Sequence, residues 1–215
     1  MTTRPDASRA PRSASILKAR LVEAHRHEFE AGLAWAADDP MVEAAAARIT
    51  GARRRFVLGA ATSFTYASLL AAKLSNALAQ VTLVDGTIVR PLDILSDVRA
   101  SDVLIVVSLR RWRGYTIDTA LPFAAAGGSL VVITDSEDNP LVKHATEAII
   151  IRPDVESRRR SDDLSMHPES PEVSPTVVAL VIDILTTLSS ASAKGAGRRF
   201  TERERLASEL GLYRD

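Results

Sequence analysis

Hydroxyl side chains follow two of the apolar segments in this 215-residue chain. The segment RFVLG (55–59) leads into Ala60-Ala61-Thr62-Ser63, and the segment DVLIVVS (102–108) ends at Ser108, before arginines at 110, 111 and 113. Hydroxyls and unpaired N–H groups at the start of a helix are typical of anion sites, and a guanidinium adds a cation for a phosphate. The candidate phosphate-binding residues are therefore Ser63, Ser108, Thr62, Arg111 and Thr116.

Each hydroxyl taken alone has a simpler explanation, because serine and threonine are common helix N-caps. Their occurrence after two separate segments is what favours an anion site. Residues 59–63 do not match the dinucleotide pattern G-x-G-x-x-G, and no Gly-Lys-Ser/Thr follows as in a P-loop. Asp85 lies where a ribose-binding acid would be, but beside Gly86 it is equally well explained as a turn residue. We therefore expect no cofactor.

Five short apolar segments predict the strands that would bring these residues together. They span 55–59, 81–85, 102–108, 129–135 and 147–153, and helical stretches lie between them at 62–79, 91–100, 114–128 and 139–146. Continuous apolar runs are typical of parallel strands covered by helices on both faces. The pattern predicts an α/β fold, a flavodoxin-like, doubly wound, five-stranded parallel sheet with flanking helices. In the order 2-1-3-4-5, Ser63 and Ser108 would face one pocket.

The remaining residues divide into flanking parts. We expect a disordered tail at 1–15, two N-terminal helices within 16–52, the sheet domain at 53–192, and a linker with a short helix at 193–215. Asp39 and Pro40 predict the start of the second helix and Gly51 its end, whereas Thr201, with Glu204 three residues later, predicts a capping box. Residues 154–175 read as a long polar loop. Residues 176–189 predict a helix that is apolar nearly all round, buried against the sheet or another subunit.

The composition argues against several classes of function. Lys+Arg and Asp+Glu are both 27, and such a balance argues against a nucleic-acid-binding surface. The absence of cysteine removes disulfides and cysteine nucleophiles and fits a reducing cytoplasm. No apolar run approaches the roughly 20 residues that a membrane-spanning helix needs. His25 and His27 do not face one point on a helix, so we predict no metal site. The lack of cysteine and of a membrane-spanning run predicts a cytoplasmic protein without membrane contact.

Three motifs in this order resemble the sugar isomerase (SIS) domain, in the version found in bacterial regulators of the RpiR and MurR type. They are FVLGAATSFTYASLLAAKLSNAL, VLIVVSLRRW and GGSLVVITDSEDNPLVKHATEAIII, within about residues 42–190. The resemblance implies a phosphosugar ligand, with Ser63 and Ser108 on its phosphate and Thr62 and Thr116 assisting.

This chain departs from the family pattern at several places. Ala61 stands where the family has glycine, Trp112 where it has tyrosine and Asn139 where it has serine. The regulators carry a helix-turn-helix domain before the SIS domain. Only residues 1–54 precede the first predicted strand here, so we expect no direct nucleic-acid binding.

SIS isomerases interconvert aldose and ketose phosphates, which requires a carboxylate or histidine to move a proton between neighbouring carbons. The resemblance places that acid in the loop before the last large helix, where Glu172 is the first catalytic candidate and His167 the second. The alternative is a solvated Pro-rich loop. When Asp183 is aligned with the corresponding helix of the isomerases, the catalytic glutamate position falls near Ser174–Pro175. The sequence therefore predicts a phosphosugar-binding homodimer or homotetramer that is an isomerase, a non-catalytic sensor, or a scaffold with a vestigial pocket.

Overall fold

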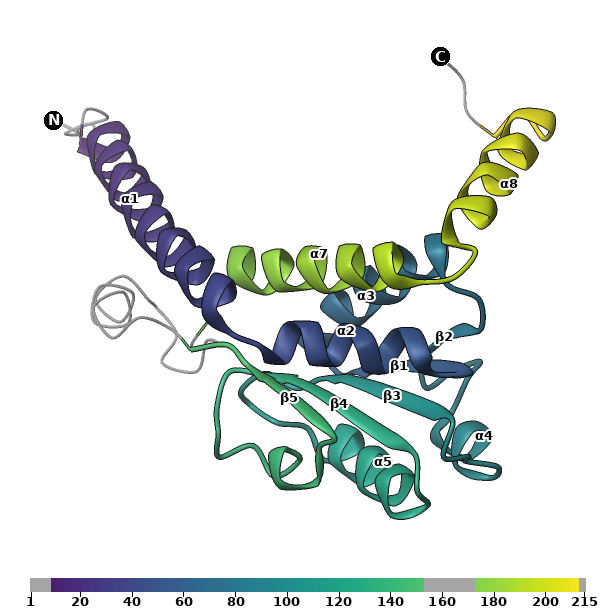
Figure 1. The fold of residues 1–215 in the computed structure, drawn as a ribbon. Coiled ribbons are helices and arrows are strands. Elements are labelled where there is room, and N and C mark those ends of the chain that lie inside the picture. The colour runs from purple at the N-terminus through teal and green to yellow at the C-terminus, as the bar shows by residue number, and fades with distance from the viewer. Residues whose placement is uncertain (1–8, 153–172, 213–215) are drawn as a thin grey trace, which may run out of the picture.

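The computed structural model describes residues 9–152 and 173–212, and Figure 1 shows how their helices and strands are arranged. Two helices precede the sheet, strands and helices then alternate, and two helices close the described part of the chain. The elements are α1 (Arg9–Asp38), α2 (Met41–Gly51), β1 (Arg54–Gly59), α3 (Thr62–Ala77), β2 (Val81–Val84), α4 (Pro91–Leu95), β3 (Asp102–Val107), α5 (Gly114–Ala125), β4 (Ser129–Thr134), the 3₁₀ turn η1 (Val142–His144), β5 (Glu147–Ile150), α7 (Pro175–Ser192) and α8 (Ala196–Glu209).

The five strands form one parallel sheet in the order β2-β1-β3-β4-β5. This confirms the predicted flavodoxin-like topology with two helices before the first strand. β1 and β3 are neighbours over their whole length, and Gly59 at the end of β1 pairs with Val107 at the end of β3. The turns that follow these two strands therefore leave the sheet side by side.

Both faces of the sheet are covered, which explains why the strands are apolar throughout. Val57, Ile105 and their neighbours face α2 and α3, and α7 packs against both of these helices. Leu58 and Leu104 face the opposite layer, where α4 and α5 lie (Figure 1). Each face thus has its own apolar core.

α7 is the one helix in 9–152 and 173–212 that is long and apolar enough to cross a membrane, judged by length and composition alone. Its side chains at Val178, Val181, Ile182 and Leu185 are fully buried, and the helix contacts α1, α2 and α3. This packing is that of a core helix of the domain.

Three helix predictions were wrong in detail. α1 begins at Arg9 rather than at residue 16. Residues 139–146 form no crossover helix but only the turn η1, because the N–H groups of Val142, His144 and Ala145 bond three residues back and Ala145 is already extended, two residues before β5. α8 begins at Ala196 after the left-handed Gly195, so Thr201 is not its N-cap; its hydroxyl instead donates to the Gly197 carbonyl within the helix.

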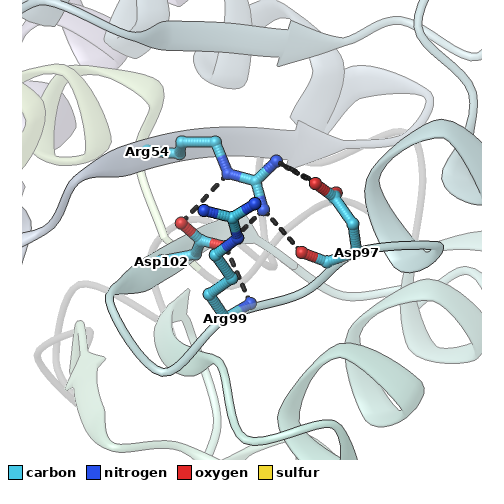
Figure 2. A network of polar contacts seen from close by, with 4 residues as sticks. All are labelled: Arg54, Asp97, Arg99 and Asp102. Atoms are coloured by element: carbon cyan, nitrogen blue, oxygen red, sulfur yellow. Dashed lines mark hydrogen bonds and ion pairs between the residues drawn. The ribbon is translucent and has the colours of Figure 1, made fainter.

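The amino-terminal edge of the sheet is held by an ion-pair network, drawn in Figure 2. The Arg54 guanidinium donates to Asp102 at 3.1 and 2.6 Å and to Asp97 at 3.0 Å, and the Arg99 N–H donates to Asp102 at 2.8 Å. Burial raises the pKa of Asp102, but the bonds from Arg54 and Arg99 lower it by more, so the net pKa lies below the ordinary value. The network fixes the start of β1 against the start of β3.

Candidate functional site

A tight turn connects β1 to α3 and depends on two small residues. The Ser63 N–H donates to the Ala60 carbonyl at 3.1 Å, which closes the turn. Ala61, at its first central position, has φ +53° and ψ −128°, the conformation that a type II′ turn assigns to glycine. A Cβ at Gly59 would lie 2.5 Å from the Ser63 carbonyl oxygen, so only glycine fits there. The turn places the start of α3 at the carboxyl edge of the sheet.

The two predicted serines lie on adjacent turns. Ser63 is buried, and its Oγ accepts the N–H of Leu109, the residue after Ser108, at 3.3 Å. Ser108 is 3% exposed, and its hydroxyl oxygen has no hydrogen-bond partner in the described part of the chain. The ends of β1 and β3 therefore converge, as the topology predicts.

A buried polar network positions the end of β3. The carbonyl of Ser108 accepts from the Thr134 hydroxyl at 2.8 Å and from the Asn139 side-chain amide at 3.0 Å, and the same amide donates to Thr134 Oγ1 at 3.0 Å. Asn139 can do this and still accept the Leu141 N–H, because an amide both donates and accepts. A serine, the family residue at this position, has a single donor and a shorter reach. The sequence singled out Asn139 only as a departure from the family and did not predict this positioning role.

A small cavity of about 130 Å³ opens between the two turns. Three predicted residues line it, Thr62, Ser63 and Arg111, and the structure adds Arg110 and Arg113. The remaining wall is Ala60, Ala61 and Leu109. Two predicted residues, Ser108 at the end of β3 and Thr116 in the first turn of α5, are buried and do not line this cavity.

Arg110 is held in place by several contacts. Its N–H donates to Asp135 at 3.1 and 3.2 Å, its guanidinium lies 5.8 Å from the centre of the Trp112 ring, and its Nη2 donates to Ser136 at 3.4 Å. Trp112 thus provides a flat surface for the neighbouring cation. Asp135 and Ser136 follow β4, so the loops after three strands meet here.

The remaining candidates are placed as follows. Glu172 and His167 lie outside the described residues. Ser174, at the aligned catalytic position, is buried directly before α7, and its Oγ lies 3.4 Å from Nδ1 of His25. Asp85 accepts the N–H groups of Thr87, Ile88 and Val89, which lower its pKa, so it is the turn residue that the simpler explanation predicts.

His25 and His27 bind neighbouring carboxylates on α1, Glu28 at 3.2 Å and Glu23 at 3.3 Å respectively. Among the described residues no group of three His, Cys, Asp or Glu side chains is arranged to hold a metal ion.

Comparison with protein families matches residues 48–192 to the model of the SIS domain. The chain belongs to the SIS domain family. The cavity between α3 and the β3–α5 loop therefore lies in the SIS domain itself. A comparison with curated proteins finds no match.

Solved structures share the fold of this SIS domain. An RpiR transcription factor from Sphaerobacter thermophilus (sugar isomerase domain) has a TM-score of 0.70 at 20% identity, covering 86% of this chain and 97% of that chain. The NanR protein of Vibrio vulnificus, complexed with ManNAc-6P, has a TM-score of 0.68 at 15% identity, covering 92% and 73%. A phosphoheptose isomerase from Francisella tularensis has a TM-score of 0.51 at 13% identity, covering 81% and 98%. Regulators and enzymes thus share this fold.

Proposed function

We propose that this SIS domain binds a phosphorylated sugar in the cavity between the β1–α3 turn and the β3–α5 loop. The observation that carries the proposal is the convergence of Ser63 and Ser108, joined by the 3.3 Å bond from the Leu109 N–H to the Ser63 hydroxyl. NanR, a protein of the same fold, was solved with ManNAc-6P, and this supports a phosphosugar as the ligand class.

The chemistry of the cavity suits a phosphate. The start of α3 supplies the hydroxyls of Thr62 and Ser63, and the opposite rim supplies the guanidinium groups of Arg110 and Arg111. A phosphate monoester has three acceptor oxygens and a charge of about −1.5 to −2, which these donors complement. The buried hydroxyl of Ser108 does not line the cavity, but Ser108 directly precedes Leu109, which does.

Isothermal calorimetry with hexose, pentose, heptose and amino-sugar phosphates tests this proposal. We expect binding by at least one of them, weakened about tenfold or more in Ser63→Ala, because the ligand loses a charge-assisted hydrogen bond. Ser68→Ala is the matched control, since the Ser68 hydroxyl bonds only to the Phe64 carbonyl of the same helix among the described residues. Absence of binding across the panel, or equal loss in both variants, contradicts the proposal.

We infer a sensing rather than a catalytic role for the site. No carboxylate or imidazole is among the described residues that line the cavity, and Ser174 stands at the aligned catalytic position. The alternative is an aldose–ketose isomerase in which Glu172 and His167 supply the acid and base. Conversion of a bound aldose phosphate to its ketose by the wild type, abolished in Glu172→Gln with binding retained, would establish the isomerase.

We further propose a homodimer or homotetramer, located in the cytoplasm. α1 and α8 project from the α7 side of the domain, away from the sheet (Figure 1). Both carry exposed large apolar side chains, and such clusters mark interaction surfaces. They are Ile16, Leu17, Leu21 and Val22 on α1, and Phe200 and Leu206 on α8.

Sedimentation at micromolar concentration tests the assembly. Val22→Glu should lower the mass to that of the monomer, because a charge would be buried in the contact. Ile88→Glu, at an exposed residue in the loop between β2 and α4, should leave it unchanged. A monomeric wild type contradicts this part of the proposal.

A further inference from the structure

Positive charge gathers where two helices begin at the same cavity. α3 and α5 are 16 and 12 residues long, and neither has an acidic residue in its first turn. The first turn of α3 and the N-cap of α5, Arg113, both line the cavity, together with Arg110 and Arg111. Helix N-termini carry partial positive charge and favour anions. Arginine side chains at this place are therefore repelled by the helix ends and by one another.

Arg113 is the clearest case of this opposition. Its carbonyl accepts the N–H groups of Thr116 and Ile117 at 3.0 and 3.2 Å, which fixes the residue at the positive end of α5. Its side chain is exposed and makes no hydrogen bond or ion pair with any described residue. The exposed guanidinium is hydrated in the free protein, and an anion that binds beside it would be attracted both by its charge and by the positive end of α5.

The two rims of the cavity differ in chemistry. The rim at 60–63 offers neutral hydroxyl donors, whereas the rim at 110–113 offers guanidinium groups. The buried hydroxyl of Ser108, which has no partner in the described part of the chain, lies one residue from Leu109 in the cavity wall. A single phosphate on the neutral rim leaves the charge of Arg113 unmatched.

We propose that the ligand carries two anionic groups, a phosphate on the α3 rim and a carboxylate near Arg113 at the start of α5. The substrate class is then a phosphorylated sugar acid. This inference rests on the proposed function and names the ligand of the same site. A carboxylate pairs with a guanidinium through charge-assisted hydrogen bonds, which gives Arg113 the partner that it otherwise lacks.

Two matched ligand pairs test the inference by calorimetry on the whole chain at low salt. They are 3-phosphoglycerate with glycerol 3-phosphate, and 6-phosphogluconate with glucose 6-phosphate; within each pair one member has an added carboxylate. We expect the acid to bind about tenfold more tightly in at least one pair. Arg113→Gln should remove that preference and change the affinity for the member without a carboxylate by less than threefold.

Arg53→Gln is the control, because Arg53 is exposed at the opposite edge of the sheet and should leave the preference unchanged. Equal binding of both members of each pair, or equal weakening of both by Arg113→Gln, overturns the inference and leaves the proposed function standing. No binding by any phosphorylated compound overturns both.

Discussion

Replacement of Ser108 by alanine tests whether its hydroxyl is held in place for a ligand. The side chain is 3% exposed and its oxygen has no partner in the described part of the chain. A buried hydroxyl without a hydrogen bond costs about 1–3 kcal/mol of folding free energy. Ser108→Ala removes that cost and leaves a void of roughly 10 Å³, worth about 0.3 kcal/mol of destabilisation. The ligand-free variant should therefore be more stable by about 1–2 kcal/mol.

The matched change at Ser63 should have the opposite sign. Its Oγ accepts the buried Leu109 N–H, so Ser63→Ala leaves that donor unpaired at a cost of about 1–3 kcal/mol. Urea unfolding of the two variants without ligand measures the difference in their free energies of unfolding. In thermal unfolding, each kcal/mol corresponds to a shift of roughly 2–4 °C in Tm for a chain of this size. Phosphosugar affinity should fall about tenfold or more in both, because each loses a donor to the phosphate.

Two results would refute this reasoning. If Ser108→Ala destabilises the free protein as Ser63→Ala does, the Ser108 hydroxyl is satisfied in the native state. If Ser108→Ala stabilises the protein and leaves phosphosugar affinity unchanged, the hydroxyl has no role in binding.

Three further substitutions test the turn and the opposite edge of the sheet. Ala61→Gly should raise the free energy of unfolding by about 1 kcal/mol, because relief of the positive φ exceeds the added chain entropy, and a lower urea midpoint would contradict this. Gly59→Ala should lower it by about 2 kcal/mol and weaken ligand binding, because the new Cβ would meet the Ser63 carbonyl; unchanged melting would exclude that close approach. The lowered pKa of Asp102 means that its ion pair with Arg54 stabilises the fold above its unfolded pKa of about 3.9 and is lost as the pH falls toward the folded value. Asp102→Asn should therefore reduce stability at pH 7 and flatten the loss of stability with acid, which urea titrations from pH 7 to pH 3 measure.

The predicted strands and the flavodoxin-like order are confirmed. The strands could be predicted because each is a short, continuous apolar run that can be recognised locally. Val103, Leu104 and Ile105 are apolar in succession, which only a strand buried on both faces requires. The helix predicted at 139–146 was wrong, since the chain is already extended at Ala145, just before β5 begins at Glu147. The cap predicted at Thr201 was wrong because the left-handed Gly195 sets the start of α8 earlier.

The sequence alone was sufficient for the family, the strands and the two serines at the strand ends, because each depends on residue type and spacing along the chain. Only the tertiary structure could decide which groups meet. The contact between the Leu109 N–H and Ser63 joins residues 46 positions apart, and the bond between Asn139 and the Ser108 carbonyl joins residues 31 apart. The unpartnered state of the Ser108 hydroxyl and of Arg113 is likewise a property of their surroundings. Such surroundings are set by sheet register and turn geometry, which no single segment of the chain encodes.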